Sequence, residues 1–181
     1  MPIDPQILHS HRLRNVNYQG DALRMGMNWT EEDCQLSLGI TVENEADEQQ
    51  VRPEELNLAH YEALCRKKFE AFPNLKYQAI TLRESYSESH NAWSACLFNG
   101  QEFFASTTYD LTHIVDRVGG GDSFAAGLIY GLATSMGDEE ALKFAVAASA
   151  LKHTIPGDMN LLTLAEVQHL MIGDASGRVQ R

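Results

Sequence analysis

Asp116-Arg117-Val118-Gly119-Gly120-Gly121-Asp122-Ser123-Phe124 is the most informative segment of this chain. It follows a predicted strand over residues 113–116 and leads into an apolar pattern of helical period. Three consecutive glycines allow backbone conformations that are closed to other residues, and they let a ligand approach the backbone N–H groups closely. These N–H groups lie at a helix start, where unsatisfied donors and the helix dipole favour an anion. The stretch therefore predicts a turn that binds phosphate.

Asp122 stands at the same helix start, where the helix dipole stabilises a negative charge. A carboxylate in this place can accept a proton from a substrate hydroxyl. Phosphoryl transfer requires positioned reactants, a base near the attacking oxygen and donors for the charge on the phosphate, and this stretch can supply the last two. The alternative is that the glycines only make a tight turn and that Asp122 only caps the helix.

Two other phosphate-binding motifs do not fit this stretch. A P-loop requires GK[ST] after its glycines, and the chain has no such sequence. A dinucleotide fingerprint requires glycine or alanine at the position that Phe124 occupies. The glycine turn is therefore of another kind.

The composition is that of an ordinary globular protein of one domain or slightly more. The 181 residues are 44% hydrophobic and carry a net charge of −11. This charge argues against a general nucleic-acid or anionic-membrane surface, although a local site can still be positive. Cys34, Cys65 and Cys96 form no CxxC pair, and the N-terminus lacks signal-peptide features, so we expect a cytoplasmic protein. The seven scattered histidines predict no metal site held by protein ligands.

Strand and helix signals are clear from Pro53 onward, whereas residues 1–50 are poorly defined. The strand signals besides residues 113–116 lie at residues 77–82, 92–98 and 101–106. Asn99-Gly100 predicts a hairpin with a type I′ turn between the last two of these strands. The helix signals run from Pro53 to the stop at Pro73, from the glycines to near Gly137, and over residues 138–152 and 164–171. Strands followed by packed helices indicate an α/β layered domain.

The stretch Asp116 to Phe124 resembles the C-terminal signature of the ribokinase-like (PfkB) carbohydrate kinases, D-T-x-G-A-G-D-x-F. Arg117 replaces the usual Thr and Gly120 the usual Ala. Both departures are similar to those of one branch of the family, the 2-keto-3-deoxygluconate kinases. The resemblance to this branch is close over residues 77–160, where its further carriers are residues 81–85, 90–91 and 151–158. It is looser over residues 30–40 and 15–18, which are similar to the N-E-E-D…L-G-I and D-L-N-Y-R segments.

The resemblance implies a ribokinase-like α/β fold, a layered sheet with flanking helices, truncated on its N-terminal side. Residues 51–181 would be its C-terminal nucleotide-binding part. The implied reaction is ATP-dependent phosphorylation of a sugar acid, with 2-keto-3-deoxygluconate converted to its 6-phosphate. Asp122 would be the base, and Gly119, Gly120 and Gly121 would form the anion hole. Mg²⁺ would arrive with ATP rather than in a protein cage.

The resemblance also implies six residues that would bind the nucleotide. They are Thr81, Arg83, Glu84, Asp116, Ala147 and Ser149. Some of them also have a purely structural explanation: Thr81 favours a strand, Arg83 suits a solvated strand end, and the small side chains from Ala147 to Ser149 permit close helix packing. The sequence leaves both explanations open.

Three functions remain open for this chain. It can be an active sugar-acid kinase that can form a homo-oligomer, and whose sugar site is completed by a partner chain or is otherwise adapted. It can be a non-catalytic nucleotide-binding fragment. It can also be a structural or interaction domain. The family's N-terminal signature, opening β-α-β units and lid strands are not recognisable, and a truncated sheet edge predicts self-association or poor solubility for the last two functions.

Overall fold

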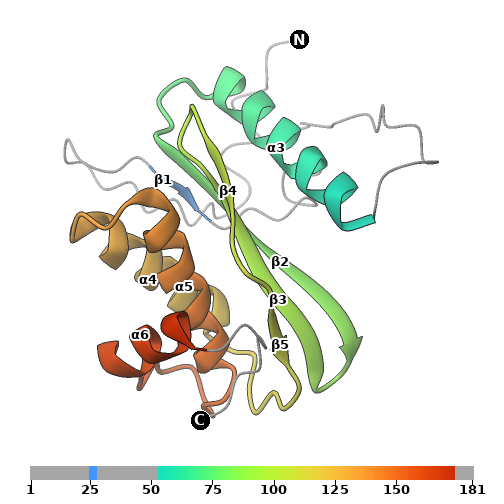
Figure 1. The fold of residues 1–181 in the computed structure, drawn as a ribbon, viewed down its shortest axis with the longest axis vertical. Coiled ribbons are helices and arrows are strands. Elements are labelled where there is room, and N and C mark those ends of the chain that lie inside the picture. Colours follow the sequence, from blue (N-terminus) through green and yellow to red (C-terminus); the bar gives the residue numbers. More distant parts are fainter. Residues whose placement is uncertain (1–24, 28–52, 174–181) are drawn as a thin grey trace, which may run out of the picture. The chain divides into compact units, whose positions relative to one another are not determined.

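The computed structural model describes residues 25–27 and 53–173 (Figure 1). The strands are β1 (Met25–Met27), β2 (Tyr77–Ser87), β3 (His90–Phe98), β4 (Phe103–Ala105) and β5 (Tyr109–Leu111). The helices are α3 (Pro53–Ala71), α4 (Gly120–Ala133), α5 (Asp138–Lys152) and α6 (Leu164–Ile172). The family resemblances of residues 15–18 and 30–40 lie outside the described residues. Across the described ranges, no helix is both long and apolar enough to span a membrane.

The strands form one five-stranded sheet with the order β1-β2-β3-β4, and β5 pairs with β3. β1 runs parallel to β2, with Met25 opposite Tyr77. β5 runs antiparallel to β3, with Leu111 opposite Asn91. Only two residues connect β2 to β3, which is the length of a tight hairpin loop. The sheet and its helices confirm the predicted α/β class.

Internal contacts divide the chain into two compact units. The first is Met1–Ile80 with Phe98–Phe103, and the second is Thr81–Leu97 with Phe104–Arg181. The boundary predicted between residues 50 and 51 remains a prediction. The glycine turn and every residue predicted to bind nucleotide belong to the second unit, so this unit contains the candidate site.

In the first unit, α3 buries one face that includes a lysine. Leu64 and Cys65 are fully buried, as the apolar spacing of the sequence predicts. Lys68 lies on the same face, and its Nζ donates to the Gln78 side-chain oxygen at 3.0 Å. The Phe69 ring packs edge-on against Phe98, with centroids 4.9 Å apart. A buried polar pair therefore joins the aromatic contacts that fix α3.

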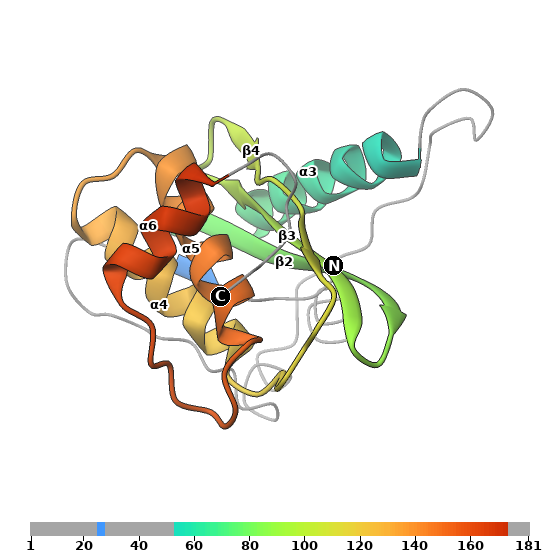
Figure 2. The ribbon, with the colours of Figure 1, turned by 60° about the horizontal axis from the view of Figure 1, so that its bottom comes forward.

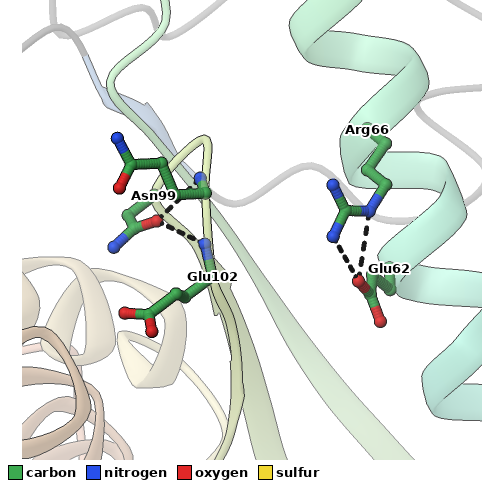
Figure 3. A network of polar contacts seen from close by, with 5 residues as sticks. Glu62, Arg66, Asn99 and Glu102 are labelled. Atoms are coloured by element: carbon green, nitrogen blue, oxygen red, sulfur yellow. Dashed lines mark hydrogen bonds and ion pairs between the residues drawn. The ribbon is translucent and has the colours of Figure 1, made fainter.

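The turn between β3 and β4 is where the sequence predicted it, but its type is different. Gly100 has a positive φ of 91° and Asn99 does not, whereas a type I′ turn needs positive φ at both residues. The Asn99 side-chain oxygen instead accepts from the backbone N–H groups of Gln101 at 2.9 Å and Glu102 at 2.8 Å. Figure 3 shows these bonds beside the Glu62–Arg66 pair of α3. An asparagine that satisfies the next amides through its side chain builds a longer turn.

In the second unit, α4, α5 and α6 form a helical layer (Figure 2). The glycine-led helix and the Ala-rich helix are confirmed where the sequence predicted them. Nearly all of α5 from Ala141 onward is buried. α6 begins with a capping box, in which Thr163 accepts from the Glu166 N–H and the Glu166 carboxylate accepts from the Thr163 N–H. The many small side chains of α5 allow α4 and α6 to pack closely against it.

The strand predicted over residues 113–116 is wrong, because the last strand is β5 at Tyr109–Leu111. The amides of the predicted strand bind elsewhere. The Ile114 N–H donates to the Ser89 carbonyl at 3.2 Å, and those of Val115 and Asp116 donate to the His153 carbonyl at 2.8 and 3.3 Å. A helix end and a turn, rather than a neighbouring strand, satisfy this segment, so it enters the glycine turn as irregular backbone.

Candidate active site around the glycine turn

The glycine turn starts α4 without a side-chain cap, and the Gly120 N–H donates to the Arg117 carbonyl at 3.3 Å. Gly119 is the N-cap residue of α4 and has a left-handed backbone, with φ 78° and ψ 0°. Its carbonyl accepts from the Ser123 N–H at 2.8 Å, which closes the first turn of the helix. A residue without a side chain cannot cap the helix itself, so no side chain of the N-cap residue competes with an anion there.

The conformation of the turn depends on close packing behind it. A Cβ atom at Gly119 would lie 2.6 Å from the Asp158 carbonyl oxygen, and one at Gly120 would lie 2.8 Å from His153 Cε1. Both positions therefore exclude any side chain. The Ser149 hydroxyl donates to the Gly120 carbonyl at 2.8 Å and holds the turn from α5.

Asp122 lies in the first turn of α4, and its side chain is exposed. Its neighbour Ser123 is buried and accepts, through its hydroxyl, a hydrogen bond from the Asn160 side-chain nitrogen at 2.8 Å. The chain around Asp122 is thus anchored while the carboxylate itself faces solvent. A substrate hydroxyl can reach a carboxylate in this position.

Asp116 is anchored through both carboxylate oxygens. Oδ1 accepts from the Val118 N–H at 3.0 Å, and Oδ2 accepts from the Gly157 N–H at 2.8 Å. These two backbone bonds, together with the charge of Lys152, hold the pKa of Asp116 below its usual value of 3.8. The contact of Asp116 with a nucleotide remains a prediction, whereas the contacts in the structure connect the entry of the glycine turn to the loop after α5.

His153 follows α5 and lies beneath the turn. Its ring is buried against Trp93, with centroids 4.9 Å apart, and it contacts Gly120 as described above. Its Nδ1 lies 2.7 Å from the Ser149 carbonyl, so Nδ1 must be the protonated donor. Burial lowers the pKa of His153 below 6.5 despite the Ser149 bond that opposes this, and the charges of Lys152, Arg117 and Arg83 lower it further.

Three cations act on His153: Lys152 at the end of α5, Arg117 in the turn and Arg83 on β2. Two carboxylates of the same segment, Asp116 and Asp122, oppose their charge, and the charge of Lys152 acts on Asp116 as well. The helix dipole at the start of α4 is therefore the feature that favours an anion there.

Arg117, the departure from the usual Thr, ties the turn to the β2–β3 loop. Its Nη2 donates to the Glu88 carbonyl at 2.6 Å, to the Ser87 carbonyl at 3.3 Å and to the Asn91 side-chain oxygen at 3.4 Å. The sequence shows that Arg117 replaces Thr, but it does not reveal these hydrogen bonds. Their acceptors lie about thirty residues earlier in the chain, and no periodic pattern connects them to Arg117.

The structure places the remaining predicted nucleotide-binding residues in two environments. On β2, Thr81 is half-buried while Arg83 and Glu84 are exposed, and Glu84 accepts a hydrogen bond from the Tyr86 hydroxyl at 3.1 Å. In α5, Ala147 and Ser149 are fully buried. Ser149 contacts the glycine turn through its bond to the Gly120 carbonyl, and the charge of Arg83 acts on His153. Nucleotide binding by all five of these residues remains a prediction.

Residues 25–27 and 53–173 contain no group of three or more His, Cys, Asp or Glu side chains placed to hold a metal ion.

Comparisons with known proteins point to one family. Residues 90–164 match the model of the pfkB family carbohydrate kinases. The 2-dehydro-3-deoxygluconokinase of Thermotoga maritima is 40% identical with a TM-score of 0.68, over 81% of this chain and 40% of that one. A PfkB family carbohydrate kinase of Listeria grayi is 28% identical with a TM-score of 0.64, over 80% of this chain and 40% of that one. No curated protein matches the chain.

A third structure supports the same branch. A candidate 2-keto-3-deoxygluconate kinase of Enterococcus faecalis is 29% identical with a TM-score of 0.66, over 80% of this chain and 39% of that one. The chain spans about 40% of the length of these solved structures. The matches confirm the resemblance to the ribokinase-like carbohydrate kinases, the ribokinase-like fold and a phosphotransferase lineage.

Proposed function

We propose that this chain provides the phosphoryl-transfer site of a sugar-acid kinase that uses ATP to phosphorylate 2-keto-3-deoxygluconate at its 6-hydroxyl. The observation that carries the proposal is the exposed carboxylate of Asp122 in the first turn of a helix whose N-cap is a left-handed glycine. The proposed base, Asp122, and the proposed anion site at the glycines are therefore adjacent in the chain. The kinase matches support the reaction class, and the Thermotoga maritima structure supports the choice of sugar acid.

Each part of the turn has a role in the proposed reaction. Asp122 accepts the proton of the sugar hydroxyl as its oxygen attacks the γ-phosphorus, and the bond from that phosphorus to the bridging oxygen of ADP breaks. The N–H groups of Gly119, Gly120 and Gly121 donate to the phosphoryl oxygens as charge develops there. ATP supplies the phosphoryl group, and Mg²⁺ on its phosphates neutralises part of their charge.

The residues around the turn fit an anionic nucleotide. Arg117 and Arg83 bring positive charge near His153, which lies against Gly120. Because Gly119 and Gly120 have no side chains, a phosphate group can approach their backbone closely. Mg²⁺ often binds through one or two carboxylates and the substrate phosphates, so the metal can enter with ATP. A homo-oligomeric state and a cytoplasmic location remain predictions.

The test is the Asp122→Asn substitution, with ATP-dependent phosphorylation of 2-keto-3-deoxygluconate as the first readout. Loss of a general base is expected to lower kcat by roughly 10²- to 10⁴-fold. ATP affinity, measured by calorimetry, should stay nearly unchanged because the glycine backbone is intact. Asp138→Asn at the start of α5 is the matched control and should retain wild-type turnover.

The outcomes separate the functions that the sequence leaves open. Wild-type turnover in Asp122→Asn contradicts the role of Asp122 as base. A folded wild-type chain without turnover contradicts catalysis by these residues alone. In that case, ATP binding indicates a nucleotide-binding module, and its absence indicates a structural domain.

A further inference from the structure

Lys152 is a buried cation that the proposed reaction does not use. It is the last residue of α5, and its side chain is fully buried. A buried ammonium is costly unless polar groups compensate its charge. Lys152 Nζ donates to the Ile155 carbonyl at 3.2 Å and to the Gly157 carbonyl at 2.7 Å. Both acceptors belong to the loop that follows α5.

Asp116 binds the same loop from the other side. Its Oδ2 accepts from the Gly157 N–H at 2.8 Å, so opposite charges hold the amide and the carbonyl of one residue. Gly157 has a left-handed backbone with φ 79°, which bends the loop between the two charges. We call this arrangement of Lys152, Asp116 and the Gly157 backbone the Gly157 clamp.

The Gly157 clamp lies directly behind the glycine turn. The next residue, Asp158, places its carbonyl oxygen where a Gly119 Cβ would lie 2.6 Å away, and Lys152 Cε would lie 3.4 Å from the same Cβ. The other oxygen of Asp116 binds the Val118 N–H, one residue before Gly119. A shift of the clamp must therefore shift the N-cap residue of α4.

We propose that Lys152 is a positioning residue for phosphoryl transfer, whose buried ammonium acts through the Gly157 clamp to set the position of the glycine turn. The inference rests on the proposed function and adds a residue that touches neither substrate. Without the ammonium, the carbonyls of Ile155 and Gly157 lose a hydrogen-bond donor, and Asp116 loses a compensating charge. The loop that holds Asp158 against Gly119 is then less firmly fixed. Misplacement of the turn by about 1 Å is expected to cost roughly 10²-fold in rate.

The experiment compares Lys152→Ala with Lys143→Ala in the full chain. Lys143 is on the same helix but pairs with Glu139 and Glu140 outside the core, so its loss should leave kcat unchanged. Lys152→Ala should lower kcat by roughly 10²-fold with a smaller change in KM for ATP. The deleted atoms correspond to n-propylammonium, which should restore part of kcat. Tetramethylammonium at equal ionic strength should not, because it has no N–H to donate.

A purely structural role predicts a different pattern. If Lys152→Ala folds with wild-type kcat, or if n-propylammonium restores nothing while the variant is folded, the proposal is overturned. If Lys152→Ala does not fold, Lys152→Met keeps the length and apolar volume of the side chain without the charge, and the same measurements apply to it.

A readout without turnover keeps the inference separate from the proposed function. Hydrogen exchange of the backbone amides is measured on the wild-type chain and both lysine variants. Loss of the Gly157 clamp should increase exchange at Val118 and Gly157, and n-propylammonium should reverse the increase. Unchanged exchange in Lys152→Ala overturns the inference even in an active kinase. Increased exchange in a chain without kinase activity supports the clamp while the proposed function fails.

Discussion

Three glycines of the second unit differ in what a side chain would meet. Gly119 combines a left-handed backbone, φ 78°, with the Asp158 carbonyl oxygen 2.6 Å from the point that a Cβ would occupy. Gly157 has a similar φ of 79°, but nothing lies within 4 Å of its Cβ position. Gly137 has neither constraint, since its φ is −59° and its surroundings are open. Backbone strain and steric exclusion can therefore be separated by experiment.

Alanine at each of these three positions should give a graded loss of stability. Gly137→Ala should cost the least of the three, because it loses only the preference of the α5 N-cap for glycine over alanine. Gly157→Ala should cost about 1–2 kcal/mol, because alanine is strained in the left-handed region. Gly119→Ala should cost more than Gly157→Ala, since the Asp158 backbone must also move. Urea unfolding of the three variants measures the order, and equal costs at Gly119 and Gly157 would show that the Asp158 contact is loose.

The packing of α4 on α5 depends on glycines at helical spacing. A Cβ at Gly127 would lie 2.9 Å from Ala145 Cα, and one at Gly131 would lie 2.7 Å from Ala141 Cβ. Both pairs are four residues apart on their helices, so the row of one helix fits against the row of the other. This close approach places the Ser149 hydroxyl within reach of the Gly120 carbonyl.

Gly127→Ala should destabilise the protein although alanine favours helix by about 1 kcal/mol. The added methyl must separate two backbones, and overpacking of this kind typically costs about 1–3 kcal/mol. Ala126→Ser, on the exposed side of the same turn, is the control and should stay within about 0.5 kcal/mol of wild type. The midpoint of thermal or urea unfolding is the measurement. A more stable Gly127→Ala protein would contradict the close helix contact.

The predicted strands 77–82 and 92–98 lie within β2 and β3, and two other predictions failed where hydrogen-bond partners differed from those that the pattern implies. The range of α5 is the one predicted, because its apolar and alanine pattern repeats with helical period. The strand predicted over residues 113–116 failed because its amides bind His153, which the pattern of four residues cannot reveal. The turn at Asn99 failed in type because a side chain, not the backbone, satisfied its amides.

At the scale of the whole molecule, the chain is acidic, but the charged side chains in its core include two lysines. The chain carries a net charge of −11, yet Lys68 and Lys152 are buried and each donates to an oxygen. His153 is buried among positive charges, which disfavour its protonation. The stability of the folded chain should therefore depend on pH through His153.

His153 has a lower pKa in the folded chain than its ordinary value of 6.5, so the unfolded chain binds more protons near that pH. Its contribution to stability should be complete above 6.5 and should be lost as the pH falls through the lower pKa of the folded state. His153→Gln should flatten the dependence of the unfolding free energy on pH across this range. An equal slope in His153→Gln and wild type would contradict the assignment.

The amino-acid sequence was enough to predict the α/β class, the helices of the second unit, the glycine turn followed by Asp122, and the resemblance to the kinases. These features depend on residue type and on spacing within a few turns, where glycine freedom, capping and periodicity act. Only the tertiary structure decided that Asp116 binds Gly157, 41 residues away, and that Lys152 and His153 are buried behind the turn. The physical reason is that burial and the pairing of charges depend on which distant segments meet, and a single chain's local pattern does not contain that information.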